Sequence, residues 1–137
     1  MVWPFFSLSF QVYKGGAFYH HSISENLPNL TPRYTLTNGY FGIRGDSTRE
    51  KIRHIESKDP IFTSNDFYNK LTHGATEKKM SNGKGTIAKL ADGTIVSYRK
   101  VSSSDGTPAV DINIKNSKES GGVKQQKIHF VKEEKEE

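Results

Sequence analysis

The stretch that decides the fold spans residues 83–131 and reads GKGTIAKLADGTIVSYRKVSSSDGTPAVDINIKNSKESGGVKQQKIHFV. It contains four short runs in which apolar and polar residues alternate. Asp92-Gly93 and Asp105-Gly106 separate the first three runs, and both are strong turn signals because glycine adopts positive φ without steric cost. The pattern predicts an antiparallel meander with strands at 86–90, 94–101, 108–115 and 125–131.

The alternation also assigns the two faces of this predicted sheet, because successive side chains on a strand point in opposite directions. Val110, Ile112 and Ile114 share one face of the third strand. Ile128 and Phe130 share the equivalent face of the fourth. If these apolar sides face one core, the other face collects Ser97, Arg99, Asp111, Asn113, Lys127 and His129. A register slip of one residue would bury that polar set, so the pairing is expected to be firmly specified.

Two helices are expected before the sheet. The spacing of Ser47 and Glu50 is typical of a capping box, and isoleucines three residues apart follow it, which predicts a helix over 48–57. A second helix is predicted over 65–73, from apolar residues at three- and four-residue spacings. The expected fold class is therefore α+β, with short N-terminal helices packed on a twisted antiparallel sheet of four or more strands.

The length and composition suggest one main domain with flanking segments. The chain has 137 residues, of which 33% are hydrophobic, so the core must be small. We expect an N-terminal extension, or the remnant of an upstream region, at 1–45, a domain at 46–131 and a charged tail at 132–137. The most apolar stretch, 2–12, is shorter than the roughly 20 residues of a membrane-spanning helix, so no stable membrane insertion is expected.

Charge and cysteine content narrow the classes of function. The net charge of +5 favours an anionic partner such as RNA or an acidic protein. The chain has no cysteine, which excludes disulfides and thiol catalysis. Neither C-x-x-C nor H-E-x-x-H occurs, so no metal site and no cofactor are expected.

The polar face of the predicted sheet carries groups that suit RNA cleavage without a metal. Such cleavage needs a base for the 2′-hydroxyl, cations for the charge on phosphorus and an acid for the leaving 5′ oxygen. His129 can serve as base or acid, and Lys127 lies two positions away on the same strand face. Arg99 on the second strand can bind phosphate through two hydrogen bonds. Hydroxyls in the following loop complete the candidate catalytic set, at Ser102, Ser104 and Thr107.

Other residues are secondary candidates for the site. Thr72 and His73 fall at the end of the second predicted helix. His21 follows His20, and adjacent residues on a strand point to opposite faces, so the two histidines do not easily serve one site. The alternative function is a non-catalytic basic module that binds RNA or protein through the same sheet face.

The motif G-x-G-T-x-A-x-L-x-D-G-T-x-V-x-x-R-x-x-S-S-S-D-G-x-P-A-V-D-I-N-I, followed by Q-K-I-H-F-V, resembles the C-terminal toxin domains of bacterial polymorphic toxins. Contact-dependent growth inhibition effectors are one source of such domains. The toxins belong to the barnase/EndoU/colicin/RelE-like group of metal-independent ribonucleases, whose fold packs one or two helices on a twisted antiparallel sheet. The resemblance covers about residues 66–131 and leaves 1–45 outside it.

The resemblance implies a function as well as a fold. It implies an endoribonuclease toxin, often acting on tRNA, that is released from a larger secreted or cell-surface protein and acts in the cytoplasm of the target cell. A cognate immunity protein neutralises it, and for a cationic cleft we expect that protein to be acidic. The site residues of the group vary, and they map here onto Arg99, Ser102, Ser104, Thr107, Lys127 and His129, with Thr72 and His73 as secondary positions.

Overall fold

The computed structural model describes residues 12–13, 22–45, 48–81, 83–102, 106–116, 118 and 123–133. In these parts of the chain it contains two α-helices, a 3₁₀ turn (η2) and ten β-strands. In chain order the elements are β1 (Val12–Tyr13), α1 (Ile23–Asn26), η2 (Leu27–Asn29), β2 (Leu36–Thr37), β3 (Tyr40–Phe41), β4 (Ile43–Arg44), β5 (Ile52–Ser57), α2 (Pro60–Leu71), β6 (Thr76–Lys79), β7 (Thr86–Lys89), β8 (Ile95–Arg99), β9 (Ala109–Asn113) and β10 (Gln125–Lys132).

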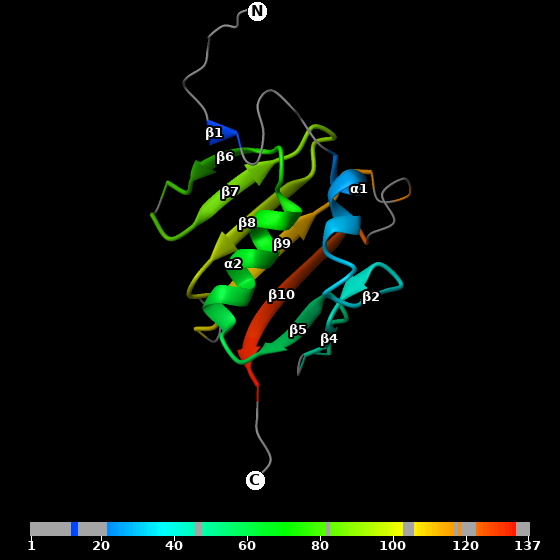
Figure 1. Ribbon diagram of the computed structural model, residues 1–137, viewed down its shortest axis with the longest axis vertical. Coiled ribbons are helices and arrows are strands. Elements are labelled where there is room, and N and C mark those ends of the chain that lie inside the picture. The colour runs from blue at the N-terminus through cyan, green and yellow to red at the C-terminus, as the bar shows by residue number, and fades with distance from the viewer. Residues whose placement is uncertain are drawn as a thin grey trace, which may run out of the picture.

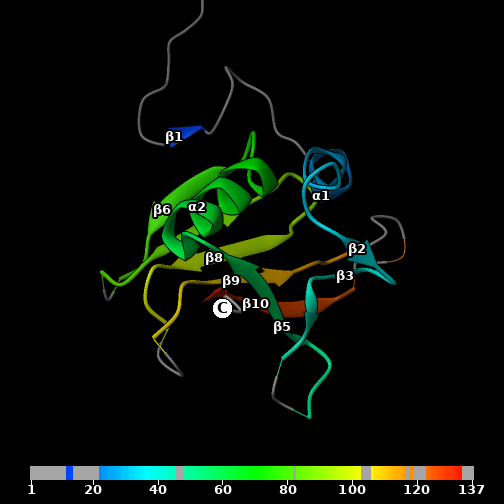
Figure 2. The ribbon, with the colours of Figure 1, turned by 60° about the horizontal axis from the view of Figure 1, so that its bottom comes forward.

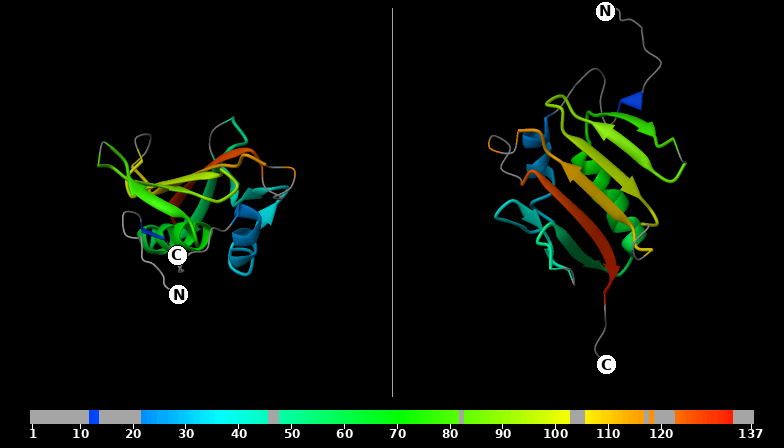
Figure 3. Two further views of the ribbon diagram at one scale, coloured as in Figure 1. Left: turned by 90° about the horizontal axis from the view of Figure 1, so that it is seen from above. Right: turned by 180° about the vertical axis from the view of Figure 1, so that it is seen from behind.

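The strands and helices form two layers. Eight strands make one sheet in the order β1-β6-β7-β8-β9-β10-β5-β4, while β2 and β3 form a small hairpin. Helices α1 and α2 lie on the same face of this sheet (Figures 1 and 2). Seen from behind, the opposite face carries no described helix (Figure 3). We call the side of the sheet away from α1 and α2 the open face; it carries Arg99, Asp111, Lys127 and His129. The predicted α+β class, with helices packed on a sheet, is confirmed.

The path of the chain explains the order of the strands in the sheet. After β5 the chain crosses the sheet as α2 and forms β6 on the far side. It then returns through β7, β8 and β9 to β10, each strand antiparallel to the one before. β10 finally pairs with β5 in parallel over six residues, Lys127 to Lys132. The sheet is therefore mixed, and the prediction that it would be wholly antiparallel was wrong at this pair.

The four strands predicted from the alternating runs are confirmed as β7, β8, β9 and β10. Their register places the expected apolar set inside, where Val110, Ile112 and Ile114 are each at most 1% exposed. The helix predicted over 65–73 is also present, although it begins at Pro60. Asp59 caps it, because its carboxylate accepts the amide of Phe62 at 3.2 Å.

The helix predicted over 48–57 was wrong, because residues 52–57 form strand β5. The spacing of Ile52 and Ile55 fits a helix, but in the sheet the two side chains point to opposite faces. Ile52 pairs with Lys127 on the open face, and Ile55 pairs with Phe130 on the core face. Isoleucine prefers strands, since its branched side chain loses rotamer freedom in a helix.

The core is centred on Phe67 of α2, which is fully buried. Its ring makes edge contacts with Tyr34, Phe41 and Phe130 at centroid distances of 5.1, 5.0 and 5.4 Å. Two of these partners precede residue 46 and one lies in β10. Residues 22–45 thus contribute to a single hydrophobic core together with the sheet and α2.

A buried cation fixes the segment that precedes and pairs with β5. Arg53 is 8% exposed, and its guanidinium donates to the carbonyl oxygens of Phe41, Gly42 and Glu50 at 3.0, 3.0 and 2.9 Å. The guanidinium carbon also lies 4.6 Å from the centroid of the Tyr40 ring. These three hydrogen bonds tie β3, the residue after it and the turn before β5 to the side chain of Arg53.

We predict that Arg53→Met lowers the free energy of unfolding by about 3 kcal/mol, because three carbonyl acceptors lose a charged donor. Urea denaturation followed by circular dichroism measures this change. Arg44→Met is the matched control, since Arg44 is the neighbour of Arg53 in the β4–β5 pair and is exposed. Equal stability in the two variants would show that the guanidinium does not hold this segment in place.

Candidate active site on the open face of the sheet

The pairing register brings the predicted site residues into two adjacent rows on the open face. The first row runs across the sheet from Arg99 through Ala109 and His129 to His54. The second row runs from Ser97 through Asp111 and Lys127 to Ile52. The structure thus brings Arg99, Lys127 and His129 to the same face, as the alternation predicted.

Ala109 separates Arg99 from His129 in the first row. Two strand spacings place their backbones roughly 9–10 Å apart. The residue between them, Ala109, is itself only 4% exposed, as is His129.

His129 is held in a fixed orientation. The ring is 4% exposed, and its Nδ1 lies 2.9 Å from the hydroxyl of Thr107, in the loop before β9. Its neighbours in sequence, Ile128 and Phe130, are fully buried on the other face and fix the direction of the strand. The bond to Thr107 fixes the orientation of the imidazole ring.

His54 is a site residue that the sequence analysis missed. It pairs with His129 across β5 and β10, and the two rings meet edge to face with centroids 6.1 Å apart. A Cβ at Gly45 would lie 2.7 Å from Nε2 of His54, so a side chain at this position would displace the imidazole from its observed place. The two isoleucines in residues 52–56, IRHIE, favour a strand. The helix predicted over this stretch left His54 out of the predicted sheet face.

Asp111 is a half-buried carboxylate among cations. Burial raises its pKa above the ordinary value of 3.8. The charges of Lys127, Arg99, His129 and Lys51 act in the opposite direction without cancelling the effect of burial. The ionised carboxylate partly neutralises this cationic face and leaves a net positive surface.

The loop hydroxyls divide between described and undescribed residues. Ser102 is 4% exposed, and its amide donates to the carbonyl oxygen of Thr107 at 2.8 Å, which closes the loop between β8 and β9. Ser104 lies outside the described residues. The hydroxyl of Thr107 therefore contacts His129, whereas Ser102 closes the loop through its backbone amide.

The secondary candidates do not join this cluster. Thr72 is fully buried, and its hydroxyl donates to the carbonyl oxygen of Tyr68 at 2.7 Å, within α2. His73 follows it at the end of the same helix, and its carbonyl accepts the side-chain amide of Asn26 at 2.8 Å. Both residues lie on the helix-covered side of the sheet. His21 lies outside the described residues.

The described residues lack two other kinds of feature. Among them, no three His, Asp or Glu side chains gather in a group that could hold a metal ion. No helix in the described part of the chain has the length and apolar character needed to cross a membrane.

Comparisons with family models, with curated proteins and with solved structures found no match for this chain.

The raised pKa of Asp111 predicts a pH-dependent effect of Asp111→Asn on stability. The folded protein binds the Asp111 proton more tightly than the unfolded chain does. The resulting stabilisation is complete below the unfolded pKa and is lost as pH rises through the folded value. The variant should therefore melt at a higher temperature than the wild type at pH 7, and this gain should vanish as the pH falls below about 4.

Melting curves between pH 3 and pH 8 check this expectation. A lower melting temperature for Asp111→Asn at pH 7 would contradict it, because it would mean that attraction to Lys127 and the other cations outweighs the cost of burying the carboxylate.

Proposed function

We propose that this protein is a metal-independent endoribonuclease of the toxin type, acting on RNA, with tRNA as the expected substrate. The observation that carries the proposal is the pair of imidazoles, His54 and His129, whose rings lie 6.1 Å apart on the open face. Arg99 stands in the same row, and Lys127 stands two residues from His129. An acid, a base and two cations are the groups that transesterification of RNA requires.

The reaction follows from these roles. One imidazole accepts the proton of the 2′-hydroxyl as that oxygen attacks the neighbouring phosphorus. The bond from phosphorus to the 5′ oxygen breaks, and the other imidazole, in its protonated form, donates a proton to that oxygen. The products are a 2′,3′-cyclic phosphate and a free 5′-hydroxyl. Arg99 and Lys127 stabilise the negative charge that accumulates on the phosphoryl oxygens.

Thr107 and Gly45 act as positioning residues in this proposal. Thr107 bonds Nδ1 of His129, and the absence of a side chain at Gly45 lets His54 occupy its place. Neither residue touches the substrate. They hold the two imidazoles in one arrangement, which matters because proton transfer depends on hydrogen-bond geometry.

The proposal includes the biological setting that the motif resemblance implies. The domain would be part of a larger secreted or cell-surface toxin of the contact-dependent growth inhibition type, released into the cytoplasm of the target cell. An acidic immunity protein would neutralise it. The net charge of +5 and the cations of the open face support such a partner, because opposite charges speed association.

The decisive test is cleavage of tRNA and of short RNA by His54→Gln and His129→Gln. We expect each variant to lose about a hundredfold or more in kcat, the range of a lost general acid or base. The pH–rate profile of each should lose one of its two limbs. His73→Gln is the matched control, since His73 lies on the other side of the sheet, and it should cleave like the wild type. Cleavage should also persist in EDTA.

Full activity in both His54→Gln and His129→Gln would remove the proposed site. Loss of activity in His73→Gln alone would move it to the end of α2. The melting temperature of each variant is measured as well, to separate loss of catalysis from loss of folding. This matters because His129 is buried and its replacement also removes the bond to Thr107.

The burial of His129 favours a second candidate, a non-catalytic basic module that binds RNA or protein. An imidazole that is 4% exposed and bonded to Thr107 can serve packing alone. In that case the wild-type protein would bind RNA without cleaving it, and His129→Gln would change stability but leave RNA affinity unchanged.

A further inference from the structure

A second cationic site lies around the edge of the sheet from the imidazole pair. It is a groove of about 860 Å³ between α2, the β6–β7 hairpin and the end of β8. Its lining includes four cations, Lys79, Lys84, Arg99 and Lys100, against one carboxylate, Glu77. That carboxylate already accepts the hydroxyl of Tyr68 at 2.7 Å. The groove therefore presents excess positive charge to any occupant.

The groove is continuous with the candidate active site through Arg99. Arg99 and Ser102 line its end, and Arg99 also belongs to the open-face row that contains His129. Gly85 also lines the groove, and its backbone packs directly against β8. A Cβ at this position would lie 2.3 Å from the carbonyl oxygen of Tyr98 and 3.0 Å from Cγ of Arg99, so a side chain here would push the β6–β7 hairpin away from Arg99.

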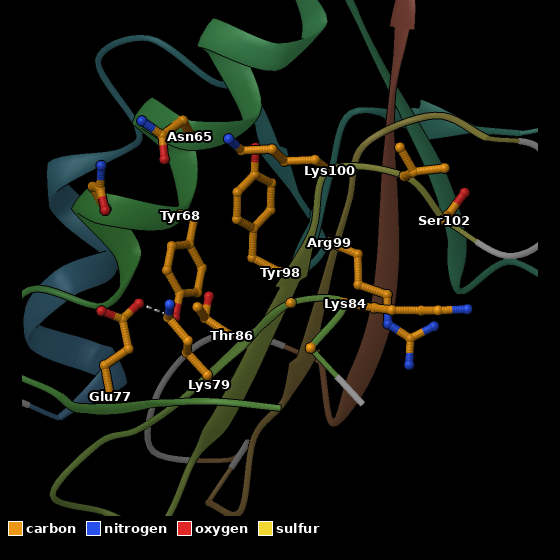
Figure 4. Close-up of a pocket in the computed structure, with 14 residues that line it drawn as sticks. Asn65, Tyr68, Glu77, Lys79, Lys84, Thr86, Tyr98, Arg99, Lys100 and Ser102 are labelled. Atoms are coloured by element: carbon orange, nitrogen blue, oxygen red, sulfur yellow. Dashed lines mark hydrogen bonds between the residues drawn. The ribbon is translucent and has the colours of Figure 1, made fainter. Parts of the chain in front are cut away.

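The lining offers two kinds of group that bind nucleotides. Figure 4 shows Lys100 directed toward Asn65 and Tyr98 across the groove, with Lys84 on the side of Arg99. Lysine ammonium groups bind phosphates, and side-chain amides such as that of Asn65 pair with base edges. The groove volume lies within the range of about 300 to 1,000 Å³ that is usual for small-molecule sites.

An exposed aromatic ring stands beside the groove. Phe62 is 58% exposed and lies one helical turn before Asn65, so both residues are on the same side of α2. Bases of single-stranded RNA stack on such rings with little regard to sequence. An acidic protein would use both the lysines and the ring, because protein interfaces are also rich in aromatic residues. The choice of RNA as the occupant therefore comes from the proposed ribonuclease function.

We infer that this groove binds the RNA segment that flanks the cleaved bond, with Lys84 and Lys100 on its phosphates and Asn65 on a base. The inference rests on the proposed ribonuclease function for the identity of the chain that enters the groove. It adds a substrate-binding site away from the reacting atoms and predicts that the protein prefers RNA longer than a dinucleotide.

The test compares Lys84→Ala/Lys100→Ala with Lys58→Ala/Lys124→Ala, a control that removes the same charge from exposed positions outside the groove lining. The probe is a fluorescein-labelled 2′-O-methyl RNA octamer, which cannot be cleaved, followed by anisotropy over a range of salt concentrations. Removing two phosphate contacts should lower the slope of log K against log salt by about 1.4 for a single strand. The control should keep the wild-type slope.

Cleavage assays supply the second readout. The groove variant should lose kcat/KM on a cleavable octamer and match the wild type on a dinucleotide. If the wild type cleaves no RNA, the proposed function fails, and the octamer titration still decides the groove on its own. Equal slopes in the groove variant and the control would overturn the inference. So would polyglutamate of eight residues binding as tightly as the octamer with the same dependence on the two lysines, because the groove would then fit an acidic protein.

Discussion

The parallel pairing of β5 with β10 is the constraint on which the rest of the structure depends. Parallel neighbours cannot be joined by a tight turn, and here the connection crosses the sheet as α2 before the meander returns. That crossing places Phe67 over the sheet. Its ring there contacts Phe41 of β3 and Phe130 of β10. The same pairing brings His54 beside His129 on the opposite face. Core and candidate site are thus two consequences of one register.

The open face combines charge with restricted exposure. His129 is almost fully buried, and Asp111 is buried enough for its pKa to rise despite four cationic neighbours. Low exposure strengthens electrostatic interactions, because less water screens them. A phosphodiester bound here would meet cations in fixed positions. Such preorganised charge is what the proposed ribonuclease requires, whereas the burial of His129 also fits the packing role of the non-catalytic alternative.

Much of the sheet was predictable from local sequence. Alternation between Asp-Gly turns identified β7 to β10, and the same alternation placed Arg99, Lys127 and His129 on one face. Such inferences succeed because side-chain direction on a strand has a period of two residues. Thr107 was also selected from the sequence, although its hydrogen bond to His129 depends on how the loop closes.

The other features of the fold and of the candidate site depend on contacts between residues that are distant in the sequence. The pairing of His54 with His129 joins positions 75 residues apart, and nothing local to 52–57 reveals its partner. A stretch with isoleucines at a spacing of three suggested a helix, and the tertiary contact with β10 made it a strand. The contribution of Tyr34 and Phe41 to the core was likewise hidden, because their shared partner, Phe67, lies in α2.

In the proposed function, His54 and His129 act together on one phosphodiester. The most direct measurement is a two-dimensional ¹H–¹⁵N NMR titration of the five histidine rings with a 2′-O-methyl dinucleotide, which lacks the attacking hydroxyl. We expect the ring signals of His54 and His129 to shift together with a single binding curve, while those of His73 stay in place. Shifts confined to His73, or no ring shifts during saturable binding, would contradict it.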